Sequence, residues 1–194
     1  MRTLVSLVTA LTLGMLGACS TSPTASFYTL DAANGQQDAY AARAISVVVT
    51  SVTVPDLVDR PQFVIRVSDN QVKLDEYSRW ADSLKSQIPR VVAADLAQYL
   101  PGARVSVSGQ ADDTAAAYRV RIDIQRFDGA PGDAATVEAL WSVSPPKGVS
   151  LPGRSMAREP CTAADAGALA AAYSRALDAV SRDIAGAIHS SATK

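Results

Sequence analysis

A ten-residue run at positions 45–54, with the sequence ISVVVTSVTV, constrains the fold of this chain most strongly. Nearly all of its residues are β-branched, which favours an extended strand. Its apolar positions are continuous rather than alternating, so the run predicts a strand that is covered on both faces. Pro55 ends the run, because proline lacks the amide donor that a sheet requires. We therefore expect a sheet with this segment near its centre.

Other segments have strand character. Residues 118–127 alternate between apolar and polar side chains, which predicts a half-exposed antiparallel strand. Asp69 and Asn70 separate two short apolar segments and predict a hairpin turn. The further strand candidates are residues 27–30, 62–67, 72–74, 103–108, 135–143 and 151–158.

Two segments have the apolar periodicity of helices. The first is expected to begin near Trp80 or Ala81 and to end at Pro101, and Pro89 inside it predicts a kink or two abutting segments. The second covers residues 163–188, about 39 Å of helix at 1.5 Å per residue. Thr162 and Asp165 have the spacing of a capping box at its start.

These elements predict an α+β fold in two layers, a mostly antiparallel sheet of six to eight strands with two helices packed on one face. The chain has 194 residues, which is enough for one domain and too few for two comfortable ones.

The first 18 residues form a separate unit. Arg2 precedes an uncharged apolar run that is too short to span a bilayer comfortably, which is the layout of a secretory signal. The run ends in Leu16, Gly17, Ala18 and Cys19, which closely resembles the lipobox of bacterial lipoproteins. That resemblance implies cleavage before Cys19 and acylation of Cys19 with two or three chains, a stable membrane anchor. The alternative is an ordinary signal peptide in which Cys19 is incidental.

The residue after the cysteine bears on location. Ser20 stands where an aspartate tends to retain Gram-negative lipoproteins at the inner membrane, so we expect an outer-membrane anchor facing the periplasm. Residues 19–26 then form the lipidated cysteine and a flexible tether, rich in serine and threonine. Residues 27–190 form a single domain.

Composition excludes several functions. The formal net charge is −1, from 18 basic and 19 acidic residues, which argues against a nucleic-acid surface. His189 is the only histidine and lies near the C-terminus, and Cys161 has no convincing histidine base. Asp75 and Glu76 are more simply local partners of Arg79 than a pair of catalytic acids. We expect no enzyme, no metal site and no cofactor.

Three stretches together resemble a known family. They are Phe-Tyr-Thr-Leu at residues 27–30, Val-Pro-Asp-Leu-Val-Asp-Arg-Pro-Gln-Phe-Val at residues 54–64, and Asp-Glu-Tyr-Ser-Arg-Trp-Ala-Asp-Ser-Leu at residues 75–84. Behind a lipobox and ahead of an alanine-rich helix, they are similar to lipoproteins of the PqiC/YmbA type. The resemblance implies an auxiliary, docking subunit of an MCE-type ABC system for lipid transport between membranes. It implies as partners the outer-membrane lipids, an MCE-domain protein and its ABC transporter.

The same motifs supply candidate partner-binding residues. Pro55 and Pro61 stiffen a loop that presents Asp56, Asp59 and Arg60, although the loop also fits a purely structural crossover. Arg79 and Trp80 are expected to place a guanidinium and a ring at the start of the first helix, where packing is the plainer interpretation. The candidates for partner binding are therefore Pro55, Asp56, Asp59, Arg60, Arg79 and Trp80.

A second functional hypothesis stays open. The domain could itself carry a hydrophobic ligand in a pocket between the sheet and the long helix, lined around residues 169–177. Self-association through the hydroxyl- and alanine-rich face of that helix is also an open expectation.

Overall fold

The computed structural model describes residues 23–33, 40–109 and 116–193. Cys19 and the signal segment lie outside these residues. The described residues form two helices, α2 (Leu84–Tyr99) and α3 (Ala166–Ser191). Their eight strands are β1 (Ser26–Tyr28), β2 (Ser46–Thr53), β3 (Gln62–Ser68), β4 (Gln71–Trp80), β5 (Arg104–Val107), β6 (Tyr118–Gly129), β7 (Ala134–Ser144) and β8 (Leu151–Pro160).

The strands form one sheet, in which β6 joins two groups. On one side of β6, β2 pairs in parallel along its first half and β5 continues the sheet beyond β2. On the other side, β7 and β8 extend it as an antiparallel meander. The β3–β4 hairpin meets the far end of β6 through the pair Ile65 and Gly129, and β1 adds in parallel to β4. The antiparallel pairings are the longest, while the parallel ones join segments distant in the chain.

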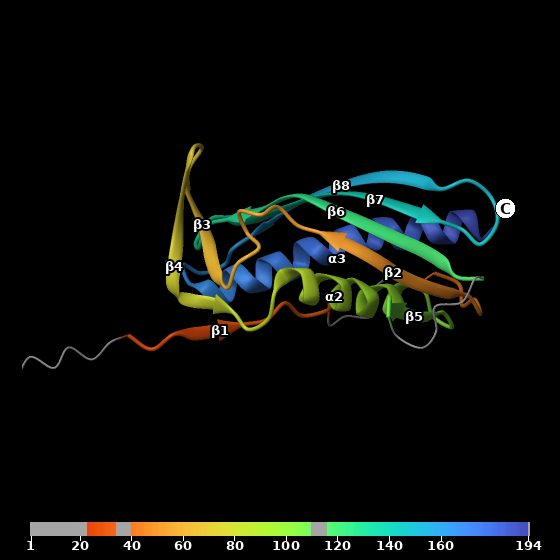
Figure 1. Cartoon of the computed structure of the whole chain (residues 1–194), viewed down its shortest axis with the longest axis horizontal. Coiled ribbons are helices and arrows are strands. Elements are labelled where there is room, and N and C mark those ends of the chain that lie inside the picture. The colour runs from red at the N-terminus through yellow and green to blue at the C-terminus, as the bar shows by residue number, and fades with distance from the viewer. Residues whose placement is uncertain (1–22, 34–39, 110–115, 194) are drawn as a thin grey trace, which may run out of the picture.

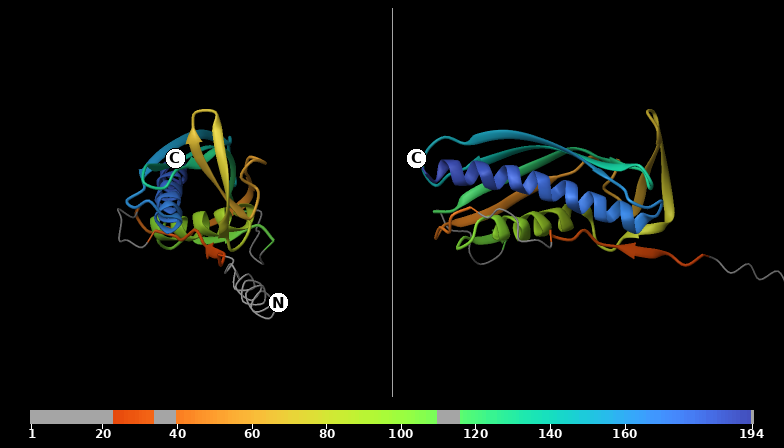
Figure 2. Two further views of the ribbon diagram at one scale, coloured as in Figure 1. Left: turned by 90° about the vertical axis from the view of Figure 1, so that its left-hand side faces the viewer. Right: turned by 180° about the vertical axis from the view of Figure 1, so that it is seen from behind.

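Both helices pack against the same face of the sheet, as Figure 2 shows, which confirms the predicted α+β fold. α2 contacts β2 and β5, and α3 contacts β7 and β8. Val47 and Val49 of β2 are buried towards the helices and Val48 is buried on the opposite side, so the prediction of a strand covered on both faces holds for this part of β2. Its last residues reach the surface at Ser51 and Thr53.

The first helix begins later than its sequence pattern predicts. Trp80 belongs to β4, where it lies opposite Tyr28 and donates its amide to the carbonyl of Pro61 at 2.7 Å. Ser83 then caps α2 by accepting the amide of Ser86 at 3.2 Å. Trp80 therefore sits at the end of a strand rather than at the start of a helix. α2 continues through Pro89 as one element rather than as two abutting segments.

The start of α3 also differs from the expectation. Asp165 is itself the N-cap and accepts the amide of Ala168 at 2.8 Å, so Thr162 is not the capping residue. The carboxylate suits this position because it also lies at the positive end of the helix dipole.

The β3–β4 hairpin stands out from the body at one end of the molecule (Figure 1). Its base is held by a cluster of five aromatic rings: Phe63 stacks on Trp80 at 4.1 Å between ring centroids, and Phe127 stacks on Tyr173 at 4.0 Å. Trp80 joins the two pairs, and Tyr28 packs on Phe63. The nearly buried Asp128 accepts from both Arg66 of β3 and Arg126 of β6, so ionic and aromatic contacts together attach the hairpin.

Candidate functional site

An open groove of about 760 Å³ runs along α3, between this helix, residues 27–33 and the end of β8. We call it the α3 groove. Gly167, Ala170, Ala171 and Ala179 give it a floor of small side chains. Arg175 and Arg182 stand along it, each next to a carboxylate. The groove is thus apolar at its floor and nearly balanced in charge at its sides.

Residues 29–33, which we call the strap, form one wall of the groove. Their backbone donors bond to side chains of both helices: the amide of Leu30 donates to Gln87 Oε1 at 2.8 Å, and that of Asp31 donates to Ser174 Oγ at 3.1 Å. The amide of Ala33 donates to Asp95 Oδ1 at 2.9 Å. The Leu30 bond is buried, and because an unpaired buried amide is costly, this bond fixes the strap against α2.

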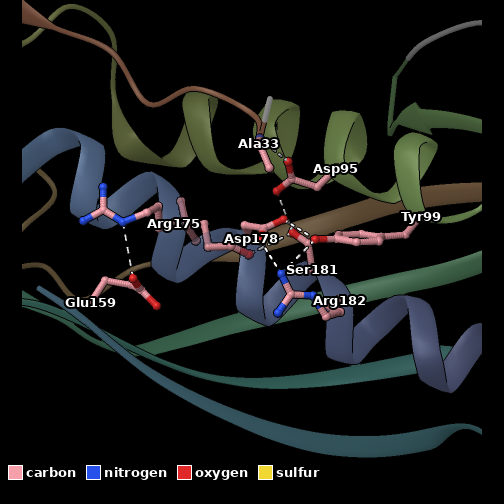
Figure 3. A network of polar contacts seen from close by, with 9 residues as sticks. Ala33, Asp95, Tyr99, Glu159, Arg175, Asp178, Ser181 and Arg182 are labelled. Atoms are coloured by element: carbon pink, nitrogen blue, oxygen red, sulfur yellow. Dashed lines mark hydrogen bonds and ion pairs between the residues drawn. The ribbon is translucent and has the colours of Figure 1, made fainter. Parts of the chain in front are cut away.

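Asp95 is fully buried where the strap, α2 and α3 meet (Figure 3). Its second carboxylate oxygen accepts the hydroxyl of Ser181 at 2.9 Å. Burial raises the pKa of Asp95 to about 6, and the nearby carboxylates of Asp178 and Asp31 add to the rise against the two hydrogen bonds. The strap is therefore tied to the helices through a carboxylate that is costly to keep ionised.

A second part of the network follows one turn along the helices. Tyr99 donates its hydroxyl to Asp178 at 2.5 Å, and Arg182 donates to Asp178 at 2.7 Å and to the Tyr99 hydroxyl at 3.1 Å. Burial and the bond to Asp178 raise the pKa of Tyr99 to about 12, so its hydroxyl stays protonated as a donor. Arg175 bonds to Glu159 of β8 and to the carbonyl of Pro160. These contacts join α2, α3 and β8 around the groove.

The open shape of the groove and its floor of small side chains suit an elongated partner. The carboxylates at the groove are engaged with donors from arginine, serine, tyrosine or the backbone. Among the described residues, no three histidine, cysteine or acidic side chains gather as metal ligands would. Within the same residues, neither helix has the length and apolarity that a bilayer-spanning helix needs.

The sequence-predicted loop lies at the base of the hairpin. Pro55 accepts the amide of Val58 in a turn at 3.0 Å, Asp56 is exposed, and Asp59 forms an ion pair with Lys85 at 2.6 Å. Arg60 is half-buried, and its Nε has no hydrogen-bond partner.

The structure brings the two charged motifs together. Gln62 at the end of the loop lies opposite Arg79 of β4, and Arg79 forms an ion pair with Glu76 at 3.4 Å. Trp80 is only 5% exposed, so its ring packs in the aromatic cluster and offers little surface to a partner. Cys19 lies outside the described residues.

The remaining chemically notable residues lie apart from the groove. Cys161 is a buried free thiol whose sulfur contacts the carbonyl of Ala163. His189 lies in the last turn of α3 with its ring stacked on Tyr40 at 4.5 Å. Among the described residues, these two contacts involve a backbone carbonyl and a tyrosine ring, and neither pairs a nucleophile with a base.

Comparison with known proteins assigns the chain to a family. A family model described as an ABC-type transport auxiliary lipoprotein component matches residues 28–185, which covers the strap, α2, most of α3 and the sheet from Tyr28 onward. The chain belongs to this family. The PqiC/YmbA-type resemblance seen in the sequence motifs is thereby confirmed.

Two solved structures have a similar fold. An uncharacterised protein superimposes with a TM-score of 0.71 at 20% identity, covering 85% of this chain and 99% of that one. Protein XCC0632 of Xanthomonas campestris, assigned to the DUF330 family, superimposes with a TM-score of 0.69 at 17% identity, covering 87% and 97%. At these identities the likeness concerns the fold. No curated protein matches the sequence.

Sequence reasoning did not identify the α3 groove, although one signal was present. Asp95 falls within the apolar stripe of the first helix, between Val92 and Tyr99, and so had to face inward. A charged residue on the inner face of an amphipathic helix predicts a buried partner, here Ser181 and the strap. The sequence does not show which segment binds Asp95, because the strap makes these contacts through backbone amides, which every residue except proline has.

Proposed function

We propose that this chain is an outer-membrane-anchored lipoprotein that faces the periplasm and docks an MCE-type ABC system for intermembrane lipid transport. The observation that carries the proposal is the family match over residues 28–185, combined with the lipobox that ends at Cys19. Acylation would confine the domain to a thin shell above the membrane and raise its effective concentration for a partner there. Its work is then tethering rather than chemistry.

The loop at residues 55–61 is the docking element of this proposal. It is bounded by two prolines and presents the exposed side chains of Asp56 and Leu57. A stiff loop loses little conformational entropy when a partner binds, which favours it as a contact. Trp80 would support the loop from beneath rather than contact the partner.

A charge reversal tests this docking element. Asp56→Lys is expected to weaken binding of a purified MCE-domain protein by roughly fivefold or more, because an exposed charge at an interface would become repulsive. The matched control is Asp69→Lys, which makes the same change at the exposed turn of the hairpin. Binding is measured by interferometry on the immobilised lipoprotein. Equal affinity of both variants would show that the loop is not the docking element. No binding by the wild type would contradict the docking function.

The second candidate function is that of a lipid-binding module, and the α3 groove is the observation that favours it. The space between α3 and the sheet, where such a pocket was expected, is filled in the described residues: Leu169 and Leu177 are fully buried in the core. A hydrophobic ligand would instead lie outside the helix, on the floor of small residues in the groove. Phospholipid retained by the purified protein in native mass spectrometry would support this function, and its loss in an Ala171→Trp variant would assign the ligand to the groove.

The same groove is the surface through which self-association would occur. Gly167 and Ala171 lie one turn apart on it and would allow a second copy to approach closely. Light scattering on the purified domain distinguishes a monomer from an assembly, and Ala171→Trp would dissociate an assembly built through this surface.

A further inference from the structure

The end of the domain nearest to the N-terminal tether exposes aromatic side chains. Phe27 of β1 is 65% exposed and Tyr77 of β4 is 50% exposed. In the parallel pairing of the two strands, Phe27 lies opposite Arg79, and Tyr28 opposite Trp80. Since side chains alternate along a strand, Tyr28 and Trp80 point into the aromatic cluster while Phe27 and Arg79 share the outer face. We call Phe27, Tyr77 and Arg79 the β1–β4 patch.

Local bonds hold the patch in this exposed form. Asp75 accepts the amides of Tyr77 and Ser78 at 3.0 and 3.2 Å, which makes a tight turn in β4 that leaves the tyrosine ring outside. Arg79 donates to the carbonyl of Glu76 at 2.9 Å and pairs with its carboxylate. In the first turn of α2, which follows β4, Lys85 is paired with Asp59. These charged side chains are thus paired with one another. What the patch exposes to a partner is mainly aromatic surface.

The chain itself limits what this surface can face. Phe27 follows Cys19 by eight residues, and eight residues reach at most about 27 Å when fully extended. Whatever path residues 20–26 take, an acylated Cys19 would keep Phe27 within that distance of the bilayer. Aromatic side chains favour the interface between lipid headgroups and acyl chains, where an arginine can keep its charge in water while its stem packs on apolar groups.

We propose that the β1–β4 patch rests in the interfacial layer of the membrane that anchors the protein, as a second contact besides the acyl chains. The inference depends on the proposed acylation of Cys19 and adds to it a fixed orientation. With this end on the membrane, the opposite end of α3 points away into the periplasm, as the layout in Figure 1 indicates. Because the patch is nearly neutral, the contact depends on aromatic insertion and not on anionic lipid.

Depth-dependent fluorescence quenching tests the proposal on the mature, acylated protein reconstituted in phosphatidylcholine vesicles. A Phe27→Trp variant reports on the patch, and Val149→Trp is the control, since Val149 is 83% exposed and lies near Ser190 at the other end of α3. The two reporters are separated by roughly 35 Å, the length of α3 between Gly167 and Ser190. The emission of wild-type protein, from Trp80 and Trp141, is subtracted.

Replacing the lipid with a phosphatidylcholine brominated on its acyl chains is expected to quench the added emission of Phe27→Trp by roughly half and to leave that of Val149→Trp unchanged, because bromine quenches only at contact depth. Addition of phosphatidylglycerol should not change the result. Tyr77→Trp provides a second reporter, which should behave as Phe27→Trp does.

Three outcomes would overturn the proposal. If the protein floats with the vesicles but both patch reporters resist quenching, the anchor exists and the interfacial contact does not. If the patch reporters change only when a purified MCE-domain protein is added, the occupant is a protein. If the protein does not float at all, the anchoring itself fails, and the proposed function fails with it.

Discussion

At the residue scale, Asp95 has the environment least expected from its sequence neighbours. Its carboxylate is enclosed by the strap, α2 and α3, and its partners are one backbone amide and one hydroxyl. The carboxylates of Asp31 and Asp178 lie near it, on the strap and on α3. The ionised form therefore depends on two hydrogen bonds for compensation, which leaves the residue sensitive to pH.

The stability of the domain is expected to depend on pH through this residue. The pKa of Asp95 is raised from 3.8 to about 6, so the folded state holds this proton more tightly than the unfolded state does. The stabilisation is complete below about pH 4 and is lost as the pH rises through about 6. Asp95→Asn cannot ionise and keeps one acceptor for the amide of Ala33. Its stability relative to wild type should thus rise by roughly 1–3 kcal/mol between pH 4 and pH 7.

Urea unfolding of both proteins across this range measures the difference. Asp69→Asn, at the exposed turn of the hairpin, is the control and should follow the wild type at every pH. A constant offset between Asp95→Asn and wild type would contradict the expectation, because it would mean that the carboxylate contributes only through its hydrogen bonds.

At the element scale, the β7–β8 meander has a close approach between one ring and one glycine. Trp141 lies opposite Gly153, and a Cβ placed on the glycine would come within 2.2 Å of the indole ring. The ring is also fastened by its Nε1, which donates to Ser155 at 2.9 Å. Ser155 in turn donates to Asp183 of α3 at 2.6 Å, so the indole helps to fix the helix on the meander.

Gly153→Ala is expected to destabilise the domain by roughly 1–3 kcal/mol, since the ring must move and its bond to Ser155 weakens. In a Trp141→Leu background the same substitution should cost much less, because the clashing ring is absent. A double-mutant cycle by denaturant unfolding measures this coupling. An equal cost in both backgrounds would show that backbone conformation, and not the ring, makes the glycine necessary.

The elements predictable from sequence are those with a strong local pattern. The alternation of β6, the meander that follows it and the stripe of α3 all depend on neighbours in the chain, and all are present. The sequence pattern places the start of α2 too early. Trp80 and the residues before it are a mixture of apolar and charged side chains that is compatible with a helix or with a strand. What makes them a strand is pairing with β1, about 50 residues earlier, and with Pro61, about 20 residues earlier.

At the scale of the whole molecule, the sequence does not predict the features that depend on parallel pairing between strands distant in the chain. β2 joins β6 across about 70 residues, and β1 joins β4 across about 50, with no turn motif to signal either pairing. The strap and the α3 groove follow from those pairings, since β1 positions the chain that continues along α3. The candidate loop and Arg79, by contrast, were identified as motifs, and the fold places them side by side.

In the proposed function, acylation at Cys19 makes this domain a membrane-bound dock for an MCE-domain protein. Vesicle flotation tests it most directly: the mature lipoprotein is reconstituted in vesicles, a purified MCE-domain protein is added, and the floating fraction is analysed. The MCE-domain protein is expected to float with vesicles carrying the acylated lipoprotein and not with vesicles incubated with the unacylated Cys19→Ala variant. If the MCE-domain protein stays at the bottom of the gradient while the acylated lipoprotein floats, the docking function is contradicted.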